Sequence, residues 1–376
     1  MDFNIEEVVE NIRVVDQERD YWFFRTYSGH LFDEFYERNY IGLGLNEIPY
    51  QYIKEASKAD EATFTRLRTS IESKYNFPAS EVTRWANQLI DFEKGVKVGD
   101  MVISPSGGSE KYAFGIVESK TFVEKDSRVF QFRDRFEPYP EKRKHIKWLK
   151  IIDSEDLNGD LKALSSTRMP LTNAFTYREA IEGNLSTVYI KEGRMYLTIQ
   201  INQDDDINAF AFAEFLSGLT YFYKEFCKEN GDEDNEDLFL KIKVQSRGKM
   251  FLKALAITGG IGLAGLIIMS SNHEVKVKLL KDIVEVEGKS TGFLESYTKF
   301  LDASQERQFR QERFEDSMAR LKAQPLQNSV TPKEDEFSDP QSTEGAGKTD
   351  PHHAKKGTKQ KDVQKPTKTA SKLKKE

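Results

Sequence analysis

The stretch GDMVISPSGGSEKYAFGIVESK, from Gly99 to Lys120, decides how the first half of the chain folds. On both sides of its Gly-Gly pair, apolar and polar residues alternate with the period of two that is typical of β-strands. The two glycines supply the backbone freedom that a tight turn requires. The stretch therefore predicts a β-hairpin.

The same residues also allow a catalytic interpretation. Asp100, Glu118 and Lys120 have the D…ExK spacing with which many nucleases hold a metal ion. In such a site two carboxylates bind the ion, and the lysine lies near the attacking water. Glu118 and Lys120 point to one side of a strand because they are two residues apart. Asp100 need not meet them, so we expect a non-enzymatic protein without a cofactor or metal and keep the nuclease as the alternative.

The residues on either side of the hairpin predict the rest of a small sheet. YWFFRT and YIGLGLNEI are typical of strands around a helix, GHLFDEFYERN, and residues 58–96 predict two helices broken near Pro78. KRKHIKWLKII then closes the sheet, with Ile146 and Trp148 on one face and lysines on the other. This order predicts an α+β fold whose first domain is a small, partly closed β-barrel with a helical insertion.

Four segments of this region resemble a known family. They are WFFRTYSGHLFDEFYERNYIGLGLNEI, RWANQLIDFEKGVKVGDMVISP, FGIV and RKHIKWL, in that order. Over residues 20–185 they are similar to the PUA-like, EVE-type domain at the N-terminus of some Mrr-type restriction proteins. The resemblance implies a reader of nucleic acid that accepts a base, modified bases included, into a pocket with aromatic walls. By analogy it also implies a role in prokaryotic defence against phage.

Eight residues of this domain are candidates for binding the ligand. Aromatic side chains would stack on a base, and basic side chains would hold phosphates. Each candidate also has a structural alternative, because aromatic residues fill cores and basic residues form solvated faces. The candidates are Trp22, Trp85, Phe114 and Trp148 for the walls, Arg25, Lys144 and Lys147 for phosphates, and Leu45, which stands where the family has tryptophan.

The next segment, residues 186–249, predicts a small α/β adaptor. STVYIKEGRMYLTIQI is typical of a hairpin that turns at Glu192-Gly193, and EDLFLKIKVQ predicts a further strand. Between them, DINAFAFAEFLSGLTYFYKEFCKEN has apolar residues at steps of three and four. This stripe predicts a helix that packs on the sheet.

The adaptor leads into an apolar segment. Residues 254–272 carry no charge for 19 positions, close to the ~20 residues that cross a bilayer. We therefore expect a transmembrane helix over 250–272, which self-associates through Ala256, Gly260 and Ala264. This places the protein in the bacterial inner membrane with its N-terminal domain in the cytoplasm. The alternative is a buried helix or hairpin in a soluble α/β unit.

The remaining segments predict an N-terminal helix over 1–19, a helical arm over 273–324 and a disordered, lysine-rich tail over 325–376. The one cysteine, Cys227, excludes an intramolecular disulfide, and the sequence lacks a phosphate loop, a GxSxG elbow and an HExxH motif. The resulting hypothesis is a membrane-anchored sensor that binds nucleic acid or a nucleotide. The alternatives are a nuclease and a structural scaffold.

Overall fold

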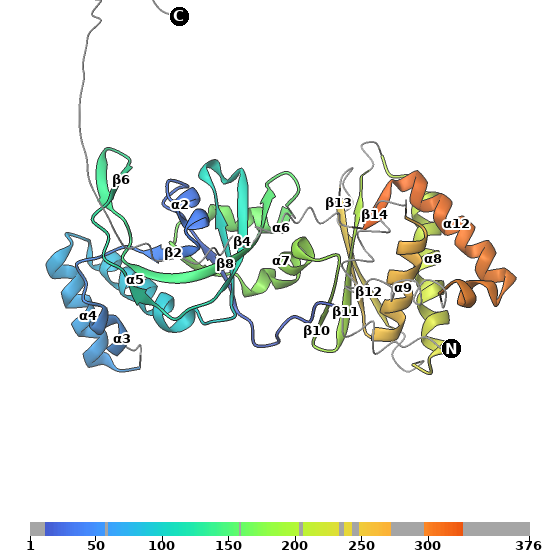
Figure 1. Cartoon of the computed structure of the whole chain (residues 1–376), viewed down its shortest axis with the longest axis horizontal. Helices are drawn as coiled ribbons and strands as arrows, with labels where there is room; N and C mark the ends of the chain where they lie inside the picture. Colours follow the sequence, from blue (N-terminus) through green and yellow to red (C-terminus); the bar gives the residue numbers. More distant parts are fainter. Residues whose placement is uncertain are drawn as a thin grey trace, which may run out of the picture. The chain divides into compact units, whose positions relative to one another are not determined.

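The structure, a computed structural model, describes residues 12–56, 59–157, 159–202, 206–232, 237–242, 248–271 and 297–325. It is a mixed α/β structure with two main sheets (Figure 1). The first sheet belongs to the N-terminal half and the second to the C-terminal half.

The first sheet curls into a half-barrel. Its strand order is β2-β8-β4-β3-β1-β9, and β5 pairs with β8 on the edge opposite to β2. Strand β1 runs parallel to β3, and the other neighbours are antiparallel. A bulge between Phe114 and Gly115 bends the long pairing of β4 with β8, which promotes the curl. The strands are β1 (Tyr21–Phe24), β2 (Tyr40–Leu43), β3 (Met101–Pro105), β4 (Lys111–Val117), β5 (Phe122–Val123), β8 (Lys142–Asp153) and β9 (Leu171–Asn173).

The expected hairpin and helices of this half are confirmed. Strands β3 and β4 pair antiparallel around a single turn of 3-10 helix at Gly107–Ser109. The predicted break at Pro78 separates two helices, because proline fits the start of a helix but not its interior. Val82, Ala86 and Leu89 point from the second helix into the core of the half-barrel. The helices are α2 (Phe32–Glu37), α3 (Tyr50–Glu55), α4 (Glu61–Lys74) and α5 (Ala79–Ile90), followed by a π-helical turn (Asp91–Gly95).

A hairpin and two helices complete the N-terminal half. The hairpin joins β6 (Val129–Phe132) to β7 (Arg135–Pro138) and pairs with neither main sheet. Helix α6 (Gly159–Lys162) and helix α7 (Arg178–Leu185) follow β8, with two 3-10 turns at Ala163–Ser166 and Phe175–Tyr177. Helix α7 leads directly into the second sheet.

The second sheet is antiparallel in the order β10-β11-β13-β12, and β14 pairs with β11. The predicted turn at Glu192-Gly193 is confirmed, and both residues have positive φ, as a two-residue hairpin turn requires. Three helices cover one face of this sheet (Figure 1). The elements are β10 (Val188–Lys191), β11 (Arg194–Ile201), α8 (Ala209–Glu229), β12 (Leu238–Ile242), β13 (Gly248–Ala254), α9 (Ile257–Met269), α12 (Gln305–Leu321) and β14 (Ala323–Pro325).

The prediction of a transmembrane helix is wrong. Gly248–Ala254 form strand β13, and the helix that follows, α9, has 13 residues. At 1.5 Å per residue it spans about 20 Å, short of the ~30 Å hydrocarbon core. No helix within the described ranges is long and apolar enough to cross a membrane. The fold class is corrected accordingly, and the inner-membrane location that we drew from this helix has no support.

The small residues of α9 pack inside the chain. Ala256, Gly260 and Ala264 are all buried. A Cβ atom on Gly260 would lie 2.6 Å from the sulfur of Met195 on β11, so glycine lets the helix approach the sheet closely. The face on which we expected self-association is therefore already covered by this chain's own sheet.

Three other expected segments are described only in part. Of the predicted N-terminal helix, residues 1–11 lie outside the described residues, and residues 12–19 are not helical, since Val14 forms a β-bridge with Ile190. Of the predicted arm, residues 273–296 lie outside the described residues, and helix α12 confirms a helix further along. All but the first residue of the predicted tail, 326–376, lies outside them as well.

Candidate functional site

The three residues of the nuclease motif have different surroundings. Asp100 is 2% exposed, and its carboxylate accepts three hydrogen bonds, from Trp22 Nε1 at 3.0 Å and from the backbone N–H groups of Lys97 at 2.8 Å and Asp20 at 3.2 Å. Burial raises the pKa of this carboxyl group above its ordinary value. Glu118 and Lys120 are exposed. In the part of the chain that the structure describes, no three histidine, cysteine, aspartate or glutamate side chains converge as metal ligands.

The four aromatic candidates belong to two different cores. Trp22, Trp85 and Trp148 pack in the cluster inside the half-barrel, whereas Phe114 packs in the cluster on the other side of the sheet. Trp148 Nε1 donates to the carbonyl oxygen of Phe35 at 3.0 Å. The structure therefore places three of the four in one core, and their indole rings have packing partners within the domain.

Leu45 and the three basic candidates also differ in setting. Leu45 has a φ of 61°, and its carbonyl oxygen accepts a hydrogen bond from Lys142 Nζ at 2.8 Å. Arg25 donates to the carbonyl oxygens of Ser165 and Thr167. These bonds place Leu45 and Arg25 in contacts that stabilise loops of the domain itself.

Lys144 and Lys147 lie on opposite sides of β8. Lys144 is 1% exposed, and its ammonium group lies 5.6 Å from the centre of the Phe92 ring. Burial lowers the pKa of this lysine. Lys147 is exposed. The expectation that the lysines of β8 oppose Ile146 is therefore wrong for Lys144, because residues two apart on a strand share a face and the curl encloses that face.

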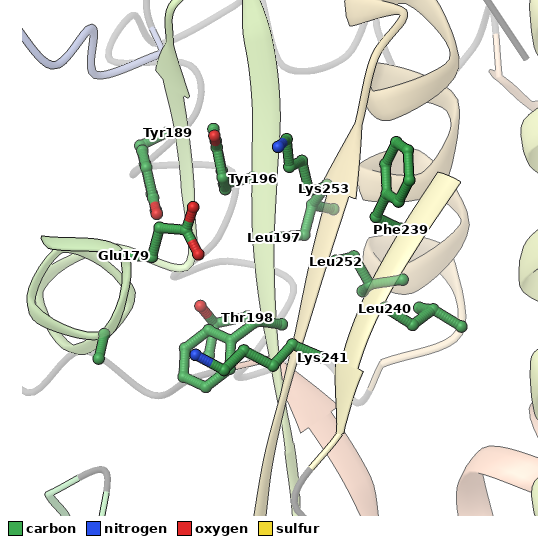
Figure 2. A pocket seen from close by; sticks show the side chains of 12 residues that line it. Glu179, Tyr189, Tyr196, Leu197, Thr198, Phe239, Leu240, Lys241, Leu252 and Lys253 are labelled. Carbon is green, nitrogen blue, oxygen red and sulfur yellow. The ribbon is translucent and has the colours of Figure 1, made fainter. Parts of the chain in front are cut away.

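A pocket lies on the face of the second sheet that the three helices leave uncovered (Figure 2). We call this surface the aromatic-lysine face. It consists of two rows of side chains that follow the cross-strand register. The first row is Tyr189, Tyr196, Lys253 and Phe239, and the second is Thr198, Phe251 and Lys241.

The first row is buried at one end and exposed to solvent at the other. The rings of Tyr189 and Tyr196 stack with centres 4.8 Å apart and planes at 2°, and both are buried. Burial raises the pKa of both phenols, so they stay neutral at physiological pH. At the other end Phe239 is 51% exposed, and Lys253 Nζ lies 5.6 Å from the centre of its ring.

The second row supplies a polar floor and a second ammonium group. The hydroxyl of Thr198 is buried and has no hydrogen-bond partner among the described residues. Phe251 is half-buried, and Lys241 is exposed. Helix α7 borders the row, since a Cβ atom on Gly183 would lie 2.4 Å from the Phe251 ring. Glu179, from the same helix, is the acidic residue of the lining.

The pocket has a volume of about 220 Å³. This is below the roughly 300–1,000 Å³ of pockets that enclose drug-sized ligands, so it suits one planar ring system better than a large molecule. Its walls offer flat π-faces, and its rim offers two ammonium groups. A planar, hydrogen-bonding group attached to an anion fits these features.

The sequence interpretation missed this face, although its pattern was visible. Along YIK, RMYLT, LFLK and MFLK, every second residue is aromatic, basic or hydroxyl-bearing, and the residues between them are aliphatic. The aliphatic set packs on the helices, which leaves the other set outside. The alternation predicts the strands, and the shared character of the outer set is the signal that reveals this face.

Comparisons with known proteins gave no match. The sequence matches no protein-family model and no curated protein, and the structure matches no solved structure.

Proposed function

We propose that this chain is a non-enzymatic nucleic-acid-binding protein, and that its aromatic-lysine face binds an unpaired base together with the adjoining phosphates. The observation that carries the proposal is the pair of rows on this face, with four aromatic rings and two lysines on neighbouring strands. The ligand class is single-stranded nucleic acid, or the same base and phosphate in a free nucleotide.

Stacking on aromatic rings is the main attraction in such a complex. Every base has a π-face, and stacking on an aromatic side chain contributes about 1–3 kcal/mol per base. The half-exposed ring of Phe239 is open to a base, while Tyr196 closes the far end of the pocket. Thr198 lies at the bottom of the pocket, and its hydroxyl oxygen is buried beneath helix α7.

The two lysines supply the second element of recognition. Lys241 and Lys253 border the pocket, and one carboxylate, that of Glu179, lines it with them. Ammonium groups near a stacked base attract the phosphates on either side of it. A basic and aromatic surface of this kind favours a nucleic acid over an uncharged aromatic compound.

The first domain enters the proposal only through its sequence resemblance. Its resemblance to PUA-like, EVE-type domains implies a nucleic-acid reader as well. A role in phage defence follows from that resemblance alone and stays a hypothesis.

The test is fluorescence anisotropy of a labelled single-stranded oligonucleotide with full-length protein. We expect Phe239→Ala to weaken binding about 10-fold or more, because it removes one stacking surface. Phe210→Ala is the matched control, because Phe210 is 81% exposed but lies on α8, which packs against the opposite face. This control should bind as the wild type does.

Competition with a nucleoside monophosphate separates the two ligand sources. Displacement of the oligonucleotide by the mononucleotide would identify a pocket for one nucleotide, and failure to displace would identify a site that needs a strand. The proposal is wrong if the wild type binds neither ligand, or if Phe239→Ala binds as tightly as Phe210→Ala.

A further inference from the structure

Glu179 lines the pocket of the aromatic-lysine face and has no role yet in the proposed function. It lies in the first turn of α7, beside Tyr189 and Tyr196 in the lining. Among the residues that the structure describes, its carboxylate has no hydrogen-bond or ion-pair partner. A carboxylate is an acceptor only, and its two oxygens can receive two neighbouring donors at once. The pocket therefore offers a pair of acceptors next to its stacking surfaces.

This carboxylate lies at the tyrosine end of the pocket. Figure 2 shows it reaching from α7 toward Tyr189 and Tyr196. After burial, the negative charge of Glu179 is the largest cause that raises the pKa of Tyr196, so the charge acts at this end. Like charges repel, so the carboxylate keeps a phosphate away from here. The group that lies against Glu179 is therefore a hydrogen-bond donor and not an anion.

The positive charge of the first row lies further along the sheet. Lys253 on β13 is the cross-strand neighbour of Tyr196 on β11, and Phe239 on β12 follows it. Neighbouring strands are about 4.8 Å apart, so the backbones at Lys253 and Phe239 lie about 5 Å and about 10 Å from that of Tyr196. A nucleotide has the same polarity, with donors on the edge of its base and a phosphate beyond its sugar. The charges of the pocket therefore fix the direction in which a nucleotide binds.

The edge of the base decides which nucleotide matches the carboxylate. Guanine has its N1–H and its N2 amino group side by side, and these two donors match the two oxygens of a carboxylate. Adenine and cytosine each have one amino group next to a ring nitrogen that accepts. Thymine and uracil have one N–H between two carbonyl oxygens. With any base but guanine, one oxygen of the carboxylate would face another acceptor, which is repulsive.

We propose that Glu179 makes this pocket selective for guanine by accepting hydrogen bonds from its N1–H and its N2 amino group. The base lies on the aromatic row with this edge toward α7, and its sugar and phosphate point toward Lys253. Hydrogen bonds to a charged group are roughly twice as strong as those between neutral groups, so they give selectivity that stacking alone lacks. The inference rests on the proposed function, because it concerns the same pocket, and adds the identity of the base.

The experiment measures the affinity of full-length protein for single-stranded oligonucleotides that carry one base between abasic nucleotides. The base is guanine, hypoxanthine or adenine. Hypoxanthine keeps the N1–H of guanine but lacks the N2 amino group, so it removes one of the two hydrogen bonds and keeps a purine ring for stacking. We expect the guanine strand to bind about 10-fold more tightly than the hypoxanthine strand, the effect of one hydrogen bond to a charged group.

Glu179→Gln tests the carboxylate itself. Its amide has one acceptor and one donor, which match the N6 amino group and N1 of adenine instead. The preference for guanine over hypoxanthine should disappear, and the adenine strand should bind at least as tightly as the guanine strand. Glu192→Gln is the matched control. Glu192 is exposed and also acts on the pKa of Tyr196, after burial and Glu179, but it does not line the pocket, so the control should keep the guanine preference.

The results separate this inference from the proposed function. Equal wild-type affinity for the guanine and hypoxanthine strands, or a guanine preference that Glu179→Gln retains, would overturn the inference. If Phe239→Ala at the same time weakens the binding of every strand, the proposed function still stands. If the wild type binds none of the strands, both are wrong.

Discussion

Asp100 shows how one buried carboxylate can be a structural residue. Its oxygens accept from Trp22 Nε1 and from the backbone N–H groups of Asp20, just before β1, and Lys97, four residues before β3. Asp100→Asn brings an amide donor to a site that already holds three donors. We expect a loss of about 1–3 kcal/mol in the free energy of unfolding, measured in urea. The exposed Asp134→Asn is the control and should stay within error of the wild type.

The pH dependence of the Asp100 effect has a definite sign. Burial raises the folded-state pKa of Asp100 above its ordinary 3.8, so the protonated carboxyl is the form that favours folding. The stability of the wild type relative to Asp100→Asn is therefore largest at acid pH and falls as pH rises through the folded pKa. A difference that grows with pH would contradict the buried setting of Asp100.

Lys142 gives the free energy of unfolding a pH dependence of the opposite sign. Burial lowers its pKa from 10.5 to about 8, so its charged form opposes folding. The stability of the wild type relative to Lys142→Met should rise by roughly 3 kcal/mol between pH 7 and about 10.5, because the folded state loses the proton first. Urea unfolding across this range measures it. A flat difference for Lys142→Met would contradict the buried site.

At the scale of elements, α9 shows why a pattern of apolar residues misled the sequence interpretation. An uncharged run of 19 residues is long enough to cross a bilayer. In the structure its first residue belongs to strand β13, and most of the rest forms the 13-residue helix α9. Both are buried by α8 and by the sheet itself. Hydrophobicity alone does not distinguish burial in lipid from burial in protein, so only the tertiary contacts decide.

Gly262 gives a test of this packing. A methyl group at this position would lie 2.3 Å from Cγ of Phe226 on α8. Alanine is better than glycine in a helix by about 1 kcal/mol, yet we expect Gly262→Ala to lower the free energy of unfolding by about 1–3 kcal/mol because it overfills the contact. In a Phe226→Leu background the same substitution should cost less. Equal costs in both backgrounds would mean that α9 does not lie against Phe226.

Local signals predicted turns and helix boundaries in both halves of the chain well. The Gly-Gly hairpin, the break at Pro78 and the turn at Glu192-Gly193 depend on backbone conformations that single residues impose, so the sequence predicts them correctly. Which face of β8 is enclosed depends on how the sheet curls, and no local pattern carries that information. For the same reason the candidate binding residues of the first domain were dispersed over two cores.

At the scale of the whole molecule, the proposed ligand site lies on the second sheet and not in the half-barrel. The aromatic-lysine face offers stacking surfaces to an unpaired base. None of its residues is among those that we predicted as ligand-binding from the sequence. The proposed function therefore depends on the outward side chains of the second sheet, not on the aliphatic ones that it buries.

The most direct test of the central proposal is the salt dependence of single-strand binding. Each phosphate that a lysine neutralises contributes about −0.7 to the slope of log K against log salt concentration. Replacing both Lys241 and Lys253 by glutamine should make the slope less steep by about 1.4. The control is Lys228→Gln, an exposed lysine on α8, and should keep the wild-type slope. Equal slopes for the double variant and the wild type would contradict binding at the aromatic-lysine face.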